Sequence, residues 1–347
     1  MKKVVVGMSG GVDSSVAAAI LKEEGYEVIG ITFIFTEDFN PKDAIDVCKK
    51  LEIEHHIIDY KEHFKKEIID KFIQDYNNGI TPNPCILCNK EVKFNFLYQK
   101  MLELHTDYIA TGHYAKIQDG HLYKSHDLAK DQTYFLAQLT KEQLQKLVLP
   151  LENITKDEVR EIARKYNLDI ADKKDSTDVC FITNKFREFI SENSKNKKGD
   201  IIEVSTNKII GQHEGLMKYT IGQRKGLNIG GAKERMYVVG KNIDKNILYI
   251  ALGDENKYLI STSCLITNLN LINGKNTTAK AKFRYRQEET EVTIEYISEK
   301  EAIISYPQGV KAVTPGQACV IYKDNECLGG GIIKEVRNDG KKLWYLL

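Results

Sequence analysis

A run of small residues near the start of the chain, Ser9-Gly10-Gly11-Val12-Asp13-Ser14-Ser15, has the composition of a phosphate-binding loop. Small residues let the backbone turn tightly, so main-chain N–H groups can approach phosphate oxygens closely. A helix that begins at Asp13 or Ser14 directs its positive end at the same anion. The lysine of a Walker loop and the Gly-x-Gly-x-x-Gly spacing of a dinucleotide site are both missing. The run therefore predicts another kind of phosphate loop; the alternative is a glycine turn with Asp13 as an ordinary helix cap.

Two cysteines, Cys85 and Cys88, are separated by two residues and follow two prolines. We expect the prolines to keep this stretch out of regular structure and a helix to run from 90 to 104. Cys88 would then lie near a helix N-terminus with Lys90 and Lys93 close by, and both effects favour the nucleophilic thiolate. The alternatives are half of a structural zinc site or two buried thiols. A zinc site usually needs a second such pair, which the sequence lacks.

A third cysteine, Cys180, stands beside Phe181, and such a residue is more often buried than catalytic when it is taken alone. Together with Cys88 and a phosphate loop, it suggests a two-thiol sulfur reaction. The chain has seven cysteines and no secretory signal, which argues against a disulfide framework. The other four are expected to be packing residues: Cys48, Cys264, Cys319 and Cys327.

The elements that must position these residues alternate in the first half of the chain. Strands are expected over 4–6, 26–34, 54–59 and 108–110, and helices over 14–24, 43–51, 61–77 and 90–104. A capping box at Thr155–Glu158 opens a further helix that ends near 166. This alternation predicts an α/β fold, a Rossmann-like doubly wound parallel sheet over residues 1–193.

The second half has short β-type runs with turn signals between them, after a polar stretch at 194–200 that resembles a linker. We expect two small β-rich domains, at 200–257 and 258–347, the last of them barrel-like. The 50 basic and 49 acidic residues nearly cancel, so any nucleic-acid surface must be a local patch. No apolar run approaches the roughly 20 residues that span a bilayer, and the start lacks a signal peptide, so we expect a cytoplasmic protein without membrane contact.

These motifs together resemble a known family. The Ser-Gly-Gly-x-Asp-Ser run resembles the PP-loop of ATP pyrophosphatases, which cleave ATP between the α and β phosphates. Over nearly its whole length the chain resembles the bacterial tRNA-specific 2-thiouridylases, which replace the 2-oxygen of the wobble uridine with sulfur. The resemblance rests on the segments Gly7–Ser14, Thr81–Asn89, Ala110–Tyr114, Lys130–Leu136, Asp175–Ile182, Tyr219–Gly226, Lys282–Arg286 and Pro315–Gln317.

The resemblance assigns roles residue by residue. It places ATP on Gly7, Met8, Ser9, Gly10, Gly11, Val12, Asp13 and Ser14, with Phe33 and Gly112 lining the adenosine. It assigns contacts with the target base or the rest of the tRNA to Asn83, Pro84, Cys85, His113, Lys130, Asp131, Gln132, Arg284, Tyr285 and Gln317. Cys180 matches the thiol that carries a persulfide and Cys88 the partner nucleophile, and Asp13 is also counted as catalytic. Without the family, His113 reads as a capped residue at a strand end and 130–132 as a solvated helix start.

The implied reaction converts the uridine at position 34 to 2-thiouridine, with AMP and pyrophosphate as products. ATP, with Mg²⁺, adenylates the uridine oxygen; a persulfide on Cys180 supplies sulfur to C2, and Cys88 resolves it, which leaves a Cys88–Cys180 disulfide. The expected partners are a tRNA with a wobble uridine and a sulfur-donating protein, either a cysteine desulfurase or a relay carrier. The target base must be flipped out of the anticodon stack.

One departure from the family leaves an alternative. Many members carry aspartate at the position of Cys85, where it is a candidate general acid or base. Cys85, Cys88 and Cys180 could instead ligate a [4Fe–4S] cluster, since such clusters are normally held by cysteine thiolates. If the sulfur is carried as a persulfide, we expect no metal-binding residues. Lys282, Arg284 and Arg286 alternate as on one face of a strand, which suits phosphate contact.

Two rival functions remain at this level. One is another PP-loop enzyme, such as a lysidine synthetase, an amidotransferase-type synthetase or an argininosuccinate synthase, none of which needs the cysteines. The other is a non-enzymatic RNA-binding protein, which would need neither Asp13 nor Cys88.

Overall fold

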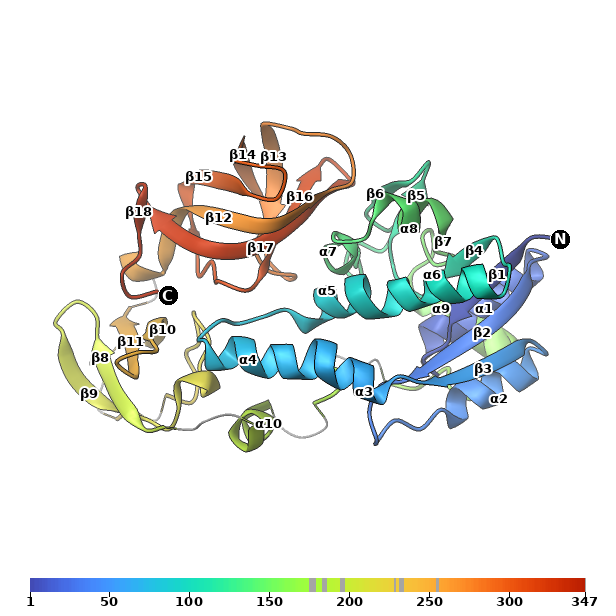
Figure 1. The fold of residues 1–347 in the computed structure, drawn as a ribbon, viewed down its shortest axis with the longest axis horizontal. Coiled ribbons are helices and arrows are strands. Elements are labelled where there is room, and N and C mark those ends of the chain that lie inside the picture. The colour runs from blue at the N-terminus through green and yellow to red at the C-terminus, as the bar shows by residue number, and fades with distance from the viewer. Residues whose placement is uncertain are drawn as a thin grey trace.

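A computed structural model describes residues 1–174, 179–182, 186–193, 197–227, 229–230, 234–253 and 256–346. The first part of the chain forms a five-stranded sheet in the order β3-β2-β1-β4-β7 (Figure 1). Its strands are β1 (Lys3–Gly7), β2 (Glu27–Ile34), β3 (Glu54–Asp59), β4 (Tyr108–Ala110) and β7 (Leu147–Val148). All adjacent pairs are parallel.

Helices cover both faces of this sheet. Val5 of β1 belongs to one buried cluster and Val4 and Val6 belong to another, as the alternation of side chains along a strand requires. The doubly wound parallel fold expected from the sequence is therefore confirmed. On one face lie α1 (Val12–Glu23), α2 (Lys42–Lys50) and α9 (Lys156–Lys165), and on the other lies α6 (Phe94–Glu103). The other helices of this part include α3 (Lys61–Phe64), η1 (Lys65–Asp70), α4 (Lys71–Asn77) and α8 (Lys141–Lys146).

The helix that carries the cysteine pair begins six residues earlier than the sequence predicted. Helix α5 (Pro84–Cys88), the π-helical turn η2 (Asn89–Lys93) and α6 (Phe94–Glu103) follow one another directly. Pro84 is the first residue of α5, a position where the missing N–H costs nothing and the fixed φ suits a helix. The expectation that both prolines keep the stretch out of regular structure is therefore wrong for Pro84.

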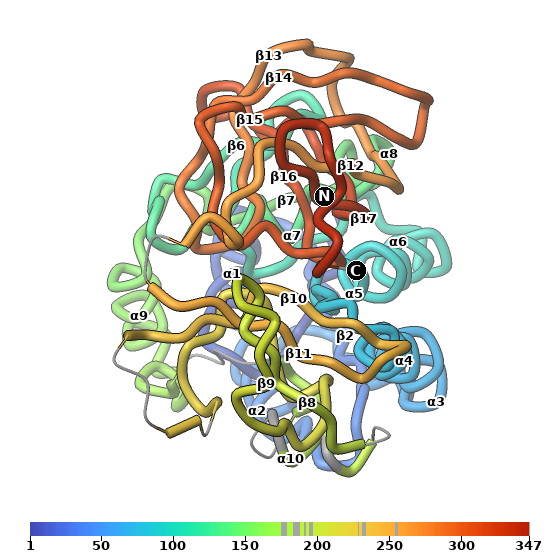
Figure 2. Tube along the Cα trace, turned by 90° about the vertical axis from the view of Figure 1, so that its left-hand side faces the viewer, coloured from blue at the N-terminus to red at the C-terminus, as the bar shows by residue number. Residues whose placement is uncertain are grey.

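The second half of the chain forms two β-structures after α10 (Phe186–Asn193), and Figure 2 shows the barrel strands above those of the smaller sheet. The smaller sheet has the order β10-β11-β8-β9, with β8 (Gly199–Glu203), β9 (Lys208–His213), β10 (Met236–Asn242) and β11 (Ile247–Leu252). Residues 194–196 of the expected linker lie outside the described residues. The domain limits themselves stay a prediction.

The last part is a closed six-stranded barrel, because β12 pairs with both β15 and β17. Its strands are β12 (Ile260–Leu271), β13 (Thr278–Lys282), β14 (Thr290–Tyr296), β15 (Ala302–Lys311), β16 (Ala318–Lys323) and β17 (Glu326–Asn338). The barrel-like expectation is confirmed. Strand β13 ends at Lys282, so Arg284 and Arg286 do not continue one face of a strand as expected. The remaining short elements are η3 (Leu216–Lys218), η4 (Lys257–Leu259) and β18 (Lys341–Lys342).

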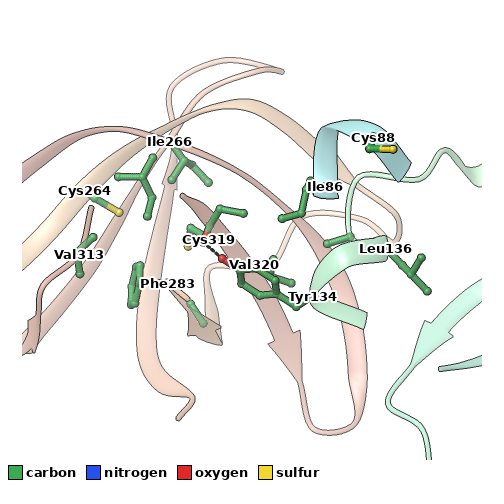
Figure 3. Packing of buried hydrophobic residues seen from close by; sticks show 14 of the residues in the cluster. Ile86, Cys88, Tyr134, Leu136, Cys264, Ile266, Phe283, Val313, Cys319 and Val320 are labelled. Atoms are coloured by element: carbon green, nitrogen blue, oxygen red, sulfur yellow. Dashed lines mark hydrogen bonds between the residues drawn. The ribbon is translucent and has the colours of Figure 1, made fainter. Parts of the chain in front are cut away.

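The barrel and the first part of the chain are joined rather than separate. A hairpin of β5 (Lys116–Gln118) and β6 (His121–Tyr123) extends the barrel sheet by pairing β6 with β17. Helices α5 and α7 (Thr133–Leu136) also lie against the barrel, and Figure 3 shows Ile86 and Tyr134 directed toward its strands while Cys88 points away from them. In the part of the chain that the structure describes, no helix is long and apolar enough to cross a membrane.

Candidate active site

The phosphate loop between β1 and α1 is held together by its own hydroxyl groups. The Ser14 hydroxyl accepts from the Ser9 N–H at 3.2 Å and donates to the Gly11 carbonyl at 3.1 Å. Helix α1 begins at Val12 after Gly11, and no side chain caps its first N–H groups. These N–H groups are therefore available to an anion. Asp13 is the second residue of α1, so the alternative of an ordinary helix cap is excluded.

The Asp13 carboxylate instead holds a cation from another helix. Its Oδ1 accepts from the Lys156 ammonium at 2.7 Å and from the Tyr114 hydroxyl at 2.8 Å. Lys156 is the first residue of α9, and the capping box of Thr155 and Glu158 fixes its position. Only 8% of Lys156 is exposed. The fold thus supplies the cation that the loop sequence lacks; the capping box revealed the helix start, but nothing in the sequence paired Lys156 with Asp13.

The two residues expected to line the adenosine lie in different surroundings. Gly112 follows β4, and a Cβ there would be 2.5 Å from the Asp13 carbonyl carbon, so only glycine allows this approach to the loop. Phe33, near the end of β2, is 8% exposed and its ring centroid lies 5.4 Å from that of Tyr60 and 6.1 Å from that of Phe96. Their contact with adenosine stays a prediction.

The cysteine pair lies inside the protein. Cys88 is the last residue of α5 and 4% exposed, whereas Cys85 is half-buried. Burial raises the pKa of the Cys88 thiol to about 12, although the charge of Lys93 opposes this shift. Burial raises the pKa of Cys85 as well. The expected thiolate at Cys88 is therefore wrong for this state, because desolvation outweighs the nearby cation; Lys90, the other expected cation, pairs with Glu91 at 3.5 Å.

Cys180 lies near this pair but is exposed. Its negative charge would raise the pKa of both Cys85 and Cys88, which places the three thiols in one neighbourhood. Within the described ranges, no three His, Cys, Asp or Glu side chains are arranged to hold a metal ion. The three thiols therefore do not fit an iron–sulfur cluster in this arrangement. Residues 175–178, which precede Cys180 in its motif, lie outside the described residues.

The turn after β4 connects the phosphate loop with the thiols. Gly112 lies against the loop, and the next residue, His113, accepts or donates a hydrogen bond with the Thr111 hydroxyl at 2.8 Å. Burial, followed by the charge of Lys93, lowers the pKa of His113 to about 3, so its ring is neutral near pH 7. The charges of the three cysteines would in turn raise the pKa of Lys93. This turn therefore places an ATP-side residue and a thiol-side residue next to each other.

In the segment after β6 that is expected to contact tRNA, the side chains of Asp131 and Gln132 form hydrogen bonds within the protein. The Asp131 carboxylate, in a residue 5% exposed, accepts from the Ser125 N–H at 3.2 Å and from the Thr133 hydroxyl at 2.7 Å. The Gln132 side-chain oxygen accepts from the Tyr114 N–H at 2.9 Å. Burial raises the pKa of Asp131. A solvated helix start is therefore excluded for Asp131; tRNA contact by 130–132 stays a prediction.

Two expected tRNA-binding residues of the barrel side, Arg284 and Tyr285, also make internal contacts. The Arg284 guanidinium donates to the main-chain carbonyls of Ile221 and Ala312, each at 2.9 Å. The Tyr285 ring centroid lies 4.4 Å from that of Phe135 in α7. Both residues thus join parts of the chain that are distant in sequence.

Asn83 and Gln317 both form hydrogen bonds with the main chain around the start of α5. The Asn83 side-chain oxygen caps α5 by accepting from the Ile86 N–H at 3.4 Å, and Pro84 is its first residue. Gln317, from the barrel, donates through its amide to the Thr81 carbonyl at 2.7 Å. The residues assigned to the target base therefore begin the helix that carries Cys85 and Cys88.

Comparison with known proteins covers the chain from end to end. Three family models match in order: "tRNA methyl transferase HUP domain" at 2–184, "tRNA methyl transferase PRC-barrel domain" at 187–252 and "Aminomethyltransferase beta-barrel domain" at 261–333. The chain is 46% identical to a tRNA-specific 2-thiouridylase of Mycoplasmopsis synoviae (99% of each chain) and 44% identical to one of Bacillus subtilis (99% of this chain, 98% of the other). A solved 4-thiouridine synthetase–RNA complex with bound ATP is 19% identical over 55% of this chain and 50% of that one, with a TM-score of 0.36.

Proposed function

The chain belongs to the family of tRNA-specific 2-thiouridylases, and we propose that it is a sulfurtransferase that converts the wobble uridine of tRNA to 2-thiouridine with ATP. One observation carries the proposal: Gly112 lies against the phosphate loop, the next residue, His113, packs against Phe94 with ring centroids 5.6 Å apart, and the neighbouring Lys93 interacts with the charges of the three cysteines. An enzyme that adenylates an oxygen and then replaces it with sulfur needs both parts within reach of one base.

The phosphate loop serves the adenylation step. The uridine O2 attacks the α-phosphorus of ATP, and pyrophosphate leaves. The uncapped N–H groups of α1 and the buried Lys156 stabilise the negative charge that develops on the phosphates. Mg²⁺ usually binds through one or two carboxylates plus substrate phosphates, and Asp13 is the acidic side chain that would hold it here. The ion would neutralise phosphate charge.

The thiols serve the sulfur step, and their different exposure supports a division of roles. Cys180 is exposed, so a donor protein, such as a cysteine desulfurase or a relay carrier, can load it with a persulfide. The terminal sulfur bonds to C2 while the Cys88 thiol attacks the Cys180 sulfur, which gives a Cys88–Cys180 disulfide; AMP leaves with the original oxygen. A thiol reductant then restores both thiols. Only 4% of Cys88 is exposed, so this thiol is shielded from solvent until the base is present.

The tRNA is expected to contact Asn83, Pro84 and Cys85 with its flipped uridine, and His113, Lys130–Gln132, Arg284, Tyr285 and Gln317 elsewhere. Several of these side chains, such as Asp131, Arg284 and Gln317, form hydrogen bonds within the protein, so they also fix the shape of the surface that binds tRNA. Cys85 has a raised pKa and is neutral, so it does not replace the aspartate of other members as a base. A tRNA substrate implies a cytoplasmic enzyme.

The test is tRNA-dependent chemistry by the purified chain. With ATP, a wobble-uridine tRNA and a persulfide donor, we expect pyrophosphate release and 2-thiouridine, detected by retardation in a mercury-containing gel. A tRNA with cytidine at the wobble position is the control and should give neither. Absence of tRNA-dependent pyrophosphate release would refute the proposal, and release without thiolation would favour another PP-loop tRNA enzyme.

A further inference from the structure

The segment that precedes the cysteine helix is held from outside by the barrel. The turn between β15 and β16 brings Pro315–Gln317 against Ile80–Pro82. The Thr81 N–H donates to the Pro315 carbonyl at 3.1 Å, and the Gln317 amide donates to the Thr81 carbonyl at 2.7 Å and the Pro82 carbonyl at 3.3 Å. Three hydrogen bonds therefore join two loops more than 230 positions apart in sequence.

The two loops are packed tightly against each other at Gly316. Gly316 has a φ of +91°, and a Cβ there would lie 2.2 Å from the Ile80 side chain and 2.9 Å from the Thr81 carbonyl oxygen. Such a distance is far below contact range, and the neighbour at 2.9 Å is backbone, which cannot move aside as a flexible side chain could. The barrel loop is therefore shaped to lie directly on the segment.

The same barrel turn reaches the helix itself. The Tyr134 hydroxyl donates to the Ala318 carbonyl at 3.0 Å and also makes a hydrogen bond with Asn83, the residue that caps α5. Cys88 is at the end of that helix, five residues beyond Asn83. The main chain held by Gln317 thus leads, over two residues, into the cap of the helix that carries the nucleophile.

The contact between the two loops also leaves a polar atom without a partner. Thr81 Oγ1 is one of four buried side-chain polar atoms among the described residues that have no hydrogen-bond partner. Buried polar groups are nearly always satisfied, so the exception at Thr81 indicates that the barrel loop holds this residue in a position that its own hydroxyl does not favour.

We propose that Gln317 is a positioning residue for the nucleophile: it fixes the main chain of Thr81 and Pro82 and thereby sets how deeply Cys88 is buried. This inference rests on the proposed function only in naming Cys88 as the nucleophile. It gives Gln317 a role in the absence of tRNA, in addition to the tRNA contact that the family resemblance suggests.

The experiment compares Gln317→Met with Gln308→Met, without tRNA or ATP. Methionine keeps the length of the side chain and removes its donor; Gln308 also donates to a main-chain carbonyl, that of Glu291 at 2.8 Å, but within the barrel, so it is a matched control. The rate at which iodoacetamide labels Cys88, located by peptide mass spectrometry, should rise about fivefold or more in Gln317→Met and stay unchanged in Gln308→Met. Amide hydrogen exchange over 80–88 should accelerate in the same variant.

A second variant and a kinetic readout make the test decisive. Gln317→Glu places a carboxylate against two carbonyl oxygens, so it should exceed Gln317→Met in both effects. In the thiolation assay kcat should fall, and a rise in the KM for tRNA would report the separate tRNA contact of Gln317. Unchanged labelling and exchange, together with a raised KM for tRNA, would overturn the inference. Since labelling and exchange need no substrate, they decide this point even if the proposed reaction fails.

Discussion

The phosphate loop and the cysteine segment are built in opposite ways. The backbone of the loop is shaped by bonds within seven residues, Ser9–Ser15, and its first helix turn already presents uncapped N–H groups; the contact of Asp13 with Lys156 is added by the tertiary fold. The cysteine segment, residues 79–89, is held by the barrel through Gln317, by α7 through the Phe135 carbonyl and by the smaller sheet through Lys241. One half of the site is thus local and ready, and the other depends on tertiary contacts.

The protonation of the two halves follows the same division. The loop needs no ionisation to bind phosphate, because N–H groups are permanent donors. Cys88 needs to be a thiolate, yet burial raises its pKa to about 12, so the thiol is protonated near neutral pH in this state. The phosphate loop therefore presents its N–H donors as it stands, whereas sulfur chemistry at Cys88 requires the surroundings of this thiol to change.

Loss of either reactive thiol should separate the two halves most strongly. We expect Cys180→Ser and Cys88→Ser each to reduce thiolation at least about 10³-fold, because serine can neither carry a persulfide nor resolve one. tRNA-dependent pyrophosphate release and tRNA binding should persist. Mercury-gel analysis and a pyrophosphate assay on the same samples measure both. Thiolation above a few per cent of the unmodified enzyme would contradict the assignment.

The next largest effect is expected on the loop side. Asp13→Asn removes the carboxylate that pairs with Lys156, whose side chain is only 10% exposed. Pyrophosphate release should fall by about 10²-fold, the size of effect seen when one preorganised electrostatic contact is lost. Asp157→Asn, one residue further along α9 and exposed, is the control and should be neutral. If Cys88 labelling without substrates changed as well, the two halves would not be independent.

A smaller effect is expected from the contact between residues 80–82 and 315–317. Gly316→Ala introduces both a strained φ of +91° and a clash 2.2 Å from Ile80, whereas Gly340→Ala, with a φ of +75°, meets nothing within 4 Å. The control should lose about 1 kcal/mol of unfolding free energy, and Gly316→Ala at least about 2 kcal/mol more. Thiolation should fall more than pyrophosphate release in Gly316→Ala. Equal melting temperatures for the two variants would show that the contact between residues 80–82 and 315–317 accommodates the extra methyl group without loss of stability.

Lys241 offers a pH-dependent test of the same segment. Its ammonium contacts the Gly79 carbonyl at 3.5 Å, only 2% of the residue is exposed, and burial lowers its pKa to about 7 from 10.5. Between pH 7 and 10.5 the unfolded chain therefore binds more protons than the folded one, so the lysine destabilises the fold increasingly as the pH falls toward 7.

Lys241→Met should accordingly raise the free energy of unfolding by roughly 1–3 kcal/mol at pH 6, and the gain should shrink toward pH 10. Thermal melts at pH 6, 8 and 10 measure it, with the exposed Lys245→Met as a control that shows no such trend. A gain that is equal at all three values would mean that Lys241 is not neutral in the fold.

The smallest effect is expected at Cys85. Because it is half-buried and neutral, Cys85→Ser should leave thiolation within about threefold of the unmodified enzyme. Iron analysis of protein purified without oxygen accompanies this assay. Complete loss of activity together with stoichiometric iron would instead support Cys85 as a cluster ligand.

By itself, the sequence determined the parts that depend on near neighbours. The strand and helix pattern up to Ala110, the start of α1 to within two residues and the Thr155–Glu158 capping box all follow from residues a few positions apart. The order of motifs also identified the family and the two kinds of chemistry. The helix start at Pro84 was missed because proline is read as a breaker, although its missing N–H is harmless in a first turn.

Only the tertiary structure decided how the site is assembled and charged. The pairing of Lys156 with Asp13 spans 143 positions, and the contact of Gln317 with Thr81 spans 236, and no local pattern encodes such a distance. The protonation of Cys88 could not be read from its neighbours either. The nearby lysine argues for a thiolate, and burial, a property of the whole fold, overrides it because removing water from a charge costs more than one cation returns.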